Sequence, residues 1–432
     1  MLSLIRKGLE KTNNITRSSY IWNAVNAIVS ALQSPIIMMV MTRTNGIYDA
    51  GVFSIAFALA TLMLYIGLYG LRRYQSSDLH EKFTFGEYHA MRIISCSCMM
   101  LVSVVYCFYG MCFSEYSGEK AAVIFLICIA KCVQAYSDVY HGCMQQKGRL
   151  DVATKSSTIR YAGELLVYVV MLLITKSLLI STAAYAAVSI LLLLLTSVNA
   201  GKNYCTYKPE FSKNIKGLII NGFPLFVSLF LNMYISNAPK YAIDAYLTEE
   251  IQAVYNMIFM PAFMVMMISN FIFNPILTTY AGLWLEGTKE SLNKLTKHIK
   301  KQMLLVAGLT VLGLAVAYTI AIPILSFIFG VDLGDYKYEL CVVMIGGGAL
   351  AYATYFSTVL TVIRLQVLLF ICYGVVAAAA AALSKFFVLN YGIMGAALMY
   401  AVLMTLLAIM LFVISMWKIM KTKGDVVAGN KE

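Results

Sequence analysis

Residues 180–199, ISTAAYAAVSILLLLLTSVN, are the stretch that decides the fold of this chain. They contain no charged side chain, and as an α-helix they would extend about 30 Å, the thickness of the hydrocarbon core of a bilayer. The whole chain has the same character, with 60% hydrophobic and 12% charged residues and a mean hydropathy of +0.77. Water-soluble globular proteins do not have this composition, so the sequence predicts an all-α polytopic membrane protein.

About twelve stretches of this kind follow one another with short connections. We place them at 20–41, 49–71, 92–113, 121–142, 158–175, 180–199, 217–238, 252–274, 303–328, 340–363, 367–388 and 394–416. The longest connection, about 275–302, has the pattern of an amphipathic cytoplasmic helix. No connection is long enough for a soluble domain.

The distribution of Lys and Arg predicts the orientation. Most of those outside the spans fall on the side of the two termini, and the opposite side has only Arg43, Lys120, Lys176, Lys240 and Lys337. By the positive-inside rule both termini are cytoplasmic. The net charge of +12 is then a consequence of topology, and we expect no nucleic-acid partner.

Several kinds of site have no support in the sequence. The basic segment 1–17 precedes a full-length span without a small-residue cleavage site, so we expect no removable signal peptide. The ten cysteines lie in or beside spans and predict neither a disulfide nor a zinc site. The four histidines are scattered, and no phosphate-binding ATPase loop is present. We therefore expect no metal and no other cofactor.

Two halves of six spans each are predicted, 1–205 and 206–432. The connection at 200–216 returns the chain to the same side of the membrane, and its polar, turn-rich sequence predicts a flexible linker without a hydrophobic anchor. A faint internal repeat supports the two halves, because spans 1 and 7 both carry amides and a proline and both end near a basic residue. We expect the halves to be two six-helix bundles.

Polar side chains follow one face of four spans. In span 1 the face contains Asn23, Asn26 and Gln33, and in span 2 it contains Tyr65 and Arg72. Spans 7 and 8 have the corresponding residues Asn232, Asn256 and Asn270. Small polar residues often only join helices to one another, but four stripes at corresponding places predict a shared polar cavity.

Charged side chains within spans are rarer. Lys131 lies near the middle of span 4, on the same face as Asp138, which is two turns away, and Glu164 lies within span 5. An ammonium at this depth requires water, an anion or a carboxylate, so Lys131 either lines a cavity or belongs to a structural ion pair. Arg43 and Lys240, at the outer ends of spans 1 and 7, either guide an anionic group or anchor their helices at the interface.

Several short motifs carry a resemblance to a known family. They are Gln33-Ser34-Pro35, Met41-Thr42-Arg43, Gly51 to Ala56, Gly70 to Gln75 and Pro239 to Asp244. Together with the span count they resemble bacterial polysaccharide-export flippases, the Wzx type that moves O-antigen or capsule repeat units. The resemblance implies the multidrug, oligosaccharidyl-lipid and polysaccharide exporter superfamily, whose fold is two six-helix bundles around a V-shaped cavity. A count of twelve spans departs from the fourteen of lipid II flippases.

The resemblance implies transport of an undecaprenyl-diphosphate-linked oligosaccharide from the cytoplasmic to the outer leaflet by alternating access. Its implied partners are that glycolipid, membrane lipids, a polysaccharide polymerase and chain-length proteins. Amides and hydroxyls of the stripes suit sugar hydroxyls, and Lys131, Arg43, Arg72 and Lys240 suit a diphosphate. Asp138 and Glu164 would bind a proton or sodium ion if transport is ion-coupled.

Two alternatives stay open at this stage. A proton- or sodium-coupled drug antiporter of the same fold would carry more carboxylates in its pocket than these spans offer. A membrane glycosyltransferase or polymerase would have a large outer loop, whereas the outer connections here are short. Because the short outer connections argue against the enzyme alternative, we expect a transporter.

Overall fold

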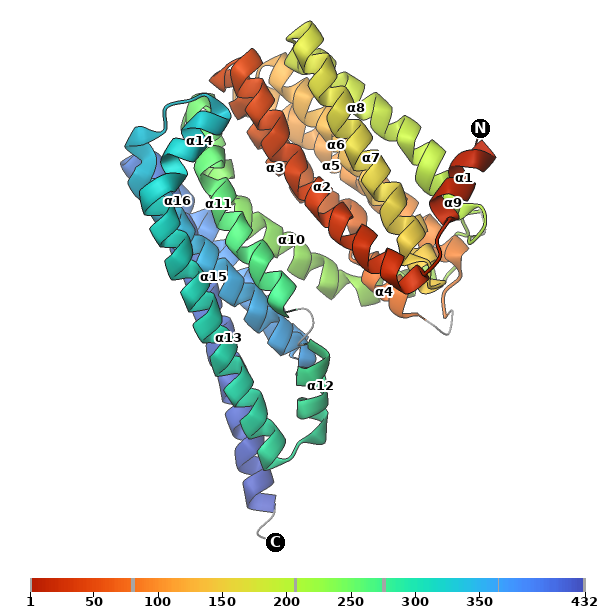
Figure 1. Cartoon of the computed structure of the whole chain (residues 1–432), viewed down its shortest axis with the longest axis vertical. Helices are drawn as coiled ribbons and strands as arrows, with labels where there is room; N and C mark the ends of the chain where they lie inside the picture. The colour runs from red at the N-terminus through yellow and green to blue at the C-terminus, as the bar shows by residue number, and fades with distance from the viewer. Residues whose placement is uncertain (1, 79–81, 206–207, 274–276, 364, 430–432) are drawn as a thin grey trace. The chain divides into compact units, whose positions relative to one another are not determined.

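The computed structural model describes residues 2–78, 82–205, 208–273, 277–363 and 365–429 (Figure 1). Over these residues the chain consists of helices and connections, with no strand, as predicted. It divides into two compact units, Met1–Met233 and Tyr234–Glu432.

The N-terminal unit is a bundle of long helices. It contains α1 (Leu2–Glu10), α2 (Ile15–Thr44), α3 (Ile47–Leu68), α4 (Leu71–Ser77), α5 (Phe85–Phe113), α6 (Gly118–Gln146), α7 (Leu150–Thr175), α8 (Leu178–Leu193) and α9 (Asn199–Gly201). Side-chain caps begin several of them; Thr84 and Glu87, for example, form a capping box at the start of α5. α6 packs against α3, α5, α7 and α8 and is therefore the central helix of this unit.

The short helix α1 is tied to the start of α7 and to α9. Lys155 donates hydrogen bonds to the carbonyl oxygens of Leu9 and Lys11, and Asn199 donates one to the carbonyl oxygen of Leu2. Leu9 is buried in the bundle, whereas Leu4 is exposed. The basic N-terminal segment is thus an ordered part of the unit.

The connection between α9 and α10 differs from its prediction. Glu210 donates its backbone N–H to the carbonyl oxygen of Gly86, and Asn214 donates its amide to the Glu87 carboxylate at 2.9 Å. Ile215 and Leu218 then enter the core of the N-terminal unit. The prediction of a linker without a hydrophobic anchor is therefore wrong, because a helix N-terminus and a hydrophobic core both hold this segment.

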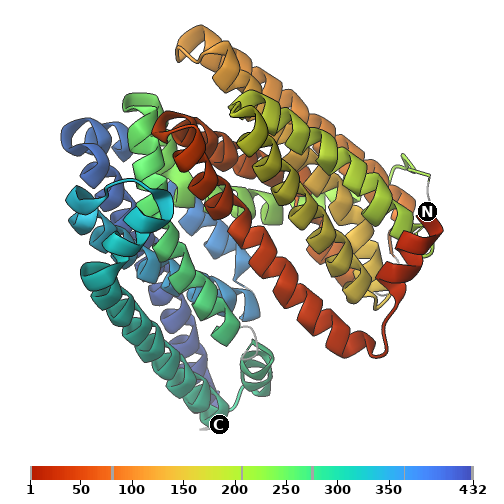
Figure 2. The same cartoon turned by 45° about the horizontal axis from the view of Figure 1, so that its top comes forward.

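α10 (Ile215–Tyr246) contains the boundary between the two units, which falls after Met233. The C-terminal unit continues with α11 (Glu249–Phe273), α12 (Leu277–Glu286), α13 (Lys289–Val316), α14 (Ile322–Phe329), α15 (Lys337–Val362) and α16 (Gln366–Gly429). α12 lies beside the start of α13 (Figure 2). Residues 277–302 are thus the short α12 followed by the first turns of α13, where the sequence predicts a single amphipathic helix; residues 275 and 276 of that prediction lie outside the described residues.

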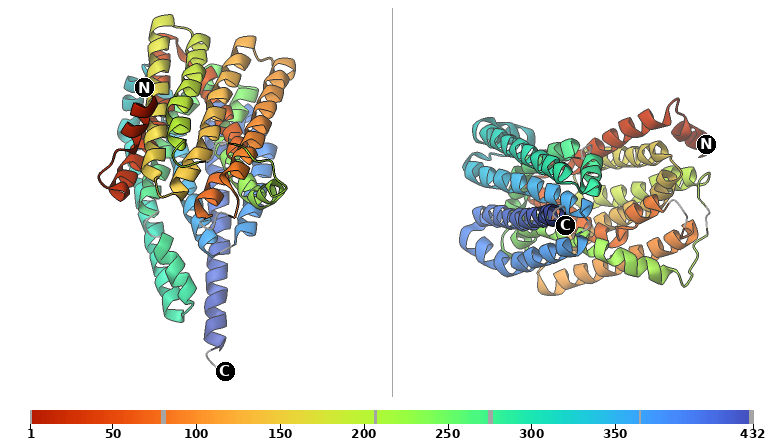
Figure 3. Two further views of the ribbon diagram at one scale, coloured as in Figure 1. Left: turned by 90° about the vertical axis from the view of Figure 1, so that its right-hand side faces the viewer. Right: turned by 90° about the horizontal axis from the view of Figure 1, so that it is seen from below.

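Gly392 divides α16 into two spans. Its φ of 54° and ψ of −132° are accessible to glycine and strained for other residues. The start of α13 and the last part of α16 both project beyond α15 at the same end of this unit, and they lie apart from each other (Figure 3).

The long helices confirm a multi-pass membrane protein. Ten segments of the described chain are long and apolar enough to cross a membrane. One of them, Val367–Asp425, contains the turn at Gly392. The number of twelve spans stays a prediction.

Three consecutive glycines allow α15 to be the central helix of the C-terminal unit. A Cβ atom on Gly346, Gly347 or Gly348 would meet Tyr400, Ala262 or Thr310, respectively. These contacts belong to α16, α11 and α13, so each glycine permits a close approach of a different helix. Small residues at helix contacts are the usual way for spans to pack closely in membranes.

Candidate functional site

A row of polar side chains runs along α6, through the middle of the N-terminal unit. Its members are spaced by three and four residues and so share one face of the helix: Lys131, Gln134, Asp138, His141 and Gln145. We call this row the α6 polar stripe. It is about 21 Å long at 1.5 Å per residue. Because other helices surround α6, the stripe faces protein and not lipid.

Asp138 is the carboxylate of the α6 polar stripe, and two arginines neutralise it. Arg92 of α5 donates to one oxygen at 2.9 Å, and Arg72 of α4 donates to the other at 3.2 Å. The Arg92 side chain is fully buried, and it also donates to the carbonyl oxygen of Gly67 at the end of α3. Arg72 is partly exposed and donates in addition to Gln145 at 3.2 Å. Asp138 therefore joins α4, α5 and α6.

Glu164 of α7 is the second buried carboxylate, and it has three partners. Arg160, one turn earlier, pairs with it at 2.8 Å, and Ser189 of α8 donates to the same oxygen at 2.7 Å. Gln33 of α2 donates to the other oxygen at 3.1 Å. Arg160 and Glu164 are each 1% exposed. The structure thus brings together Gln33 and Glu164, two predicted site residues that are 131 positions apart.

Lys131 lies close to this second cluster but has a different environment. Glu164 and Arg160 both act on it electrostatically, but among the described residues no carboxylate is within ion-pair distance of its ammonium. Its nearest partners are the ring of Phe57, with the ammonium 4.1 Å from the centroid, and the amide oxygen of Gln134 at 3.5 Å. A cation–π contact allows this charge to be buried without being neutralised.

Lys240 has the same arrangement in the C-terminal unit. It is buried in α10, and its ammonium lies 4.6 Å from the ring centroid of Phe259 on α11. In the part of the chain that the structure describes, it too has no ion-paired carboxylate. Each unit therefore contains one buried lysine whose side-chain nitrogen rests on a phenylalanine ring.

The remaining predicted site residues lie outside the Asp138 and Glu164 clusters, and they differ in how far they are buried. Asn23 and Arg43 are exposed on α2, and Asn26 accepts a 3.5 Å hydrogen bond from Thr158. Tyr65 on α3 and Asn232 on α10 are half-buried, and Asn256 on α11 is buried. Asn270 lies outside the residues whose side chains the structure describes. A shared cavity lined by all of these residues stays a prediction.

The sequence reasoning missed Arg92, which it counted among the topological charges of the cytoplasmic side. The signal that could have identified Arg92 is its depth in the membrane, which matches that of Asp138. Arg92 lies seven residues after the start of α5, and Asp138 lies eight residues before the end of α6, so two antiparallel neighbours place them at the same level. Pairing of α5 with α6 cannot be read from either helix alone.

The chemistry of the two clusters differs from that of the two lysines. A carboxylate between guanidinium, amide and hydroxyl donors is compensated, and such a cluster joins helices within a unit. Ion coupling by Asp138 or Glu164 therefore stays a prediction. An ammonium on an aromatic ring retains unused donors, and these can bind phosphate oxygens.

A comparison with protein families finds one match. The model described as "Polysaccharide biosynthesis protein" matches residues 17–280, which is more than half of the chain. No curated protein sequence matches.

Solved structures with the same fold are transporters. An inward-facing multidrug resistance MATE family transporter of the MOP superfamily superposes with a TM-score of 0.67 at 12% identity, over 94% of this chain and 99% of that one. The lipid II flippase MurJ, in an inward closed conformation, gives 0.64 at 14% identity, over 94% and 91%. A MOP superfamily transporter from Pyrococcus furiosus gives 0.54 at 14% identity, over 95% and 96%. The fold is the one that these proteins share.

Proposed function

The chain belongs to the polysaccharide biosynthesis protein family, and from that premise we propose that it is a flippase for lipid-linked oligosaccharides. The substrate class is an undecaprenyl-diphosphate-linked repeat unit for O-antigen, capsule or exopolysaccharide, moved from the cytoplasmic to the outer leaflet of a bacterial inner membrane. The termini are cytoplasmic in this proposal, in agreement with the positive-inside rule. A polymerase and chain-length proteins would use the exported product.

The pair of buried lysines is the observation that carries the proposal. A sugar headgroup cannot cross hydrocarbon unless protein groups replace its water, and a diphosphate in addition needs cations. Lys131 and Lys240 are buried and carry no carboxylate partner among the described residues. The aromatic ring under each ammonium makes the unbound state tolerable, and a diphosphate would supply the missing anion.

Alternating access is the mechanism that we propose, with the two units as the moving bodies. Each unit has its own packed interior, and one lysine of the pair belongs to each unit. The N-terminal unit would move as one body, because the Asp138 and Glu164 clusters join its helices.

The test measures headgroup movement in proteoliposomes. The full-length protein is reconstituted with an undecaprenyl-diphosphate-linked oligosaccharide, and a glycosidase outside the vesicles reports the sugar that reaches the outer leaflet. We expect Lys131→Gln and Lys240→Gln each to slow this movement by about tenfold or more, the value of one charge-assisted hydrogen bond. Neither should lower the melting temperature, because neither leaves a buried carboxylate unpaired.

The matched control is Lys337→Gln. Lys337 also lies over an aromatic ring, Tyr318 at 3.6 Å, but at the start of α15 and not buried. The Lys337→Gln variant should move the headgroup at the rate of the unsubstituted protein. Full transport by the double variant Lys131→Gln/Lys240→Gln would contradict the role of the lysines.

The antiporter alternative makes a different prediction in the same vesicles. The likeness to multidrug transporters at a TM-score of 0.67 is the observation that favours it. A proton or sodium gradient would then drive a cationic dye across the membrane, while the glycolipid headgroup would stay in its leaflet. That result would replace the flippase proposal.

A further inference from the structure

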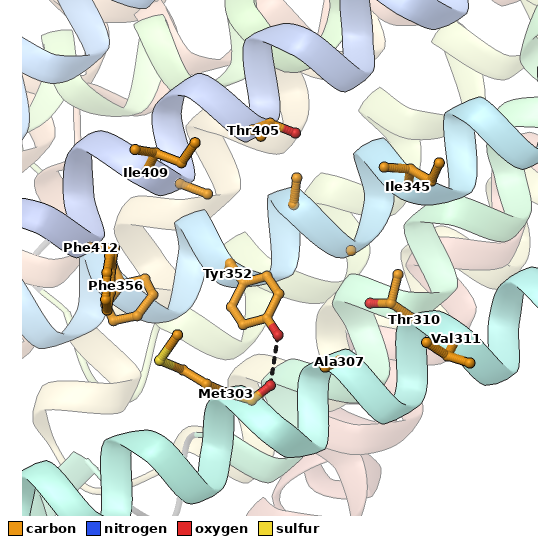
Figure 4. Close-up of a pocket in the computed structure, with 13 residues that line it drawn as sticks. Met303, Ala307, Thr310, Val311, Ile345, Tyr352, Phe356, Thr405, Ile409 and Phe412 are labelled. Atoms are coloured by element: carbon orange, nitrogen blue, oxygen red, sulfur yellow. Dashed lines mark hydrogen bonds between the residues drawn. The ribbon is translucent and has the colours of Figure 1, made fainter.

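The C-terminal unit contains a pocket of about 430 Å³ between α13, α15 and α16 (Figure 4). Its volume is within the range of small-molecule sites in proteins, about 300–1,000 Å³. It belongs entirely to this unit, and neither Lys131 nor Lys240 lines it. The transport proposal therefore does not use it.

The wall of the pocket suits hydrocarbon. Two of its three lining hydroxyls, those other than Thr405, already donate hydrogen bonds: Tyr352 to the carbonyl oxygen of Met303 at 2.6 Å, and Thr310 to that of Val306 at 2.8 Å (Figure 4). A polar occupant such as a sugar would lose its hydration and find few partners. The occupant that the wall favours is an apolar chain.

Small and large residues alternate to make this space. Ala307 and Ala408 leave room between α13 and α16, and at one end the rings of Phe356 and Phe412 pack edge to face with centroids 5.3 Å apart. The pocket is open to the surroundings of the spans, where Leu304 and Val311 are 74% and 65% exposed. In a membrane these surroundings are lipid tails, so a chain can enter from the bilayer.

A lysine continues the pocket face of α13. Lys300, Met303, Ala307 and Thr310 are spaced by three, four and three residues and so lie on one face of the helix. Lys300 is exposed and lies about one turn before Met303 along α13. In Figure 4, Met303 lies toward the end of the pocket where Phe356 and Phe412 are labelled. Four further lysines of α13, Lys289, Lys294, Lys297 and Lys301, make this the basic end of the helix.

We propose that the pocket binds an acyl chain of an anionic phospholipid, with the lipid phosphate at Lys300. The occupant comes from the leaflet on the lysine-rich side of the membrane. Two observations select it: an apolar pocket open to lipid, and a cation on the same helix face at its basic end. Basic sites between spans on the cytoplasmic side are known to bind anionic headgroups. The proposal requires only that the chain spans a membrane, so it stands or falls independently of the transported substrate.

The test uses photolabelling in nanodiscs. The full chain is placed in discs that contain a trace of phospholipid with a diazirine in its acyl chain, as phosphatidylglycerol or as phosphatidylcholine, and adducts are located by mass spectrometry. We expect adducts within 303–311 and 405–412 to be about fivefold more abundant with phosphatidylglycerol. Equal labelling by both lipids, or labelling spread evenly over the spans, would overturn the proposal.

Matched substitutions separate the two parts of the site. Lys300→Gln should remove the preference for phosphatidylglycerol, whereas Lys301→Gln, a neighbouring exposed lysine turned by 100°, should keep it. Ala408→Phe should fill the pocket and lower the adducts, and Leu312→Phe, on an exposed face of α13, should not. Because Lys300→Gln is an exposed change, it keeps the test decisive if Ala408→Phe does not fold.

A competition experiment identifies the class of lipid. Excess unlabelled phosphatidylglycerol should displace the photoprobe from the pocket, and a polyisoprenyl phosphate at the same concentration should not. Displacement by the polyisoprenyl phosphate alone would make an isoprenoid chain the occupant and would overturn the assignment to a phospholipid.

Discussion

The helices within each of the two units are held together by different interactions. The N-terminal unit buries ion pairs, with Arg92 and Asp138 in one cluster and Arg160 and Glu164 in another. In the described part of the C-terminal unit, Lys240 is the only charged residue that is buried. Both units have glycines at close helix contacts, such as Gly67 in the first and Gly347 in the second. The comparison teaches that membrane helices of one fold can pack through small residues with or without buried ion pairs.

Among the substitutions that compare the two units, one in the Asp138 cluster should lower the free energy of unfolding the most. Asp138→Leu leaves Arg92 fully buried without a counter-charge, and such a loss costs about 3–5 kcal/mol. We expect a corresponding fall in the free energy of unfolding, measured by denaturant titration of the purified protein in micelles.

The control for this prediction is the double variant Arg92→Leu/Asp138→Leu. It removes both buried charges, so it should regain a large part of the lost stability, while Arg72 stays partly exposed and keeps Gln145. A loss under about 1 kcal/mol for Asp138→Leu alone would show that the pair behaves like an exposed one.

In the C-terminal unit, enlarging a glycine at a close helix contact should lower stability by overpacking. A Cβ atom at Gly347 would lie 2.8 Å from both the Cβ and the carbonyl oxygen of Ala262. Backbone cannot yield as a side chain can, so we expect Gly347→Ala to cost about 1–3 kcal/mol.

Gly374→Ala is the matched control, since a Cβ atom there would meet nothing within 4 Å. It should leave the melting temperature unchanged or raise it, because alanine favours the helix. Similar melting temperatures for the two variants would contradict glycine-mediated packing of α15.

A pair of buried serines gives the smallest and most direct comparison. Ser189 donates to the Glu164 carboxylate on another helix at 2.7 Å, whereas Ser415 donates to the carbonyl oxygen of Leu411 in its own helix at 2.7 Å. We expect Ser189→Ala to cost about 0.6–1.7 kcal/mol, the range for hydrogen bonds between membrane helices.

Ser415→Ala should have almost no effect, because the carbonyl oxygen that loses this donor is already part of the helix. Thermal melting followed by size-exclusion chromatography resolves the two outcomes. Equal losses of stability in Ser189→Ala and Ser415→Ala would contradict the difference between a hydrogen bond that joins two helices and one within a single helix.

Much of the candidate site was visible in the sequence as residue types at membrane depth. Lys131, Asp138 and Glu164 were recognised because charges are costly within a span. Their partners were not, since Gln33 reaches Glu164 only when α2 packs on α7, and Arg92 reaches Asp138 only when α5 packs on α6. The linker prediction failed for the same reason, because Glu87 holds Asn214 from another helix.

The sequence by itself determined that the chain crosses a membrane about twelve times as helices, because length and hydropathy are properties of each segment alone. Its charges likewise predict the orientation. Only the tertiary structure decided which charges neutralise one another, which lysines rest on an aromatic ring, and where a pocket opens between α13 and α16. These depend on which face of one helix meets which face of another, and that choice is made by packing across the whole unit.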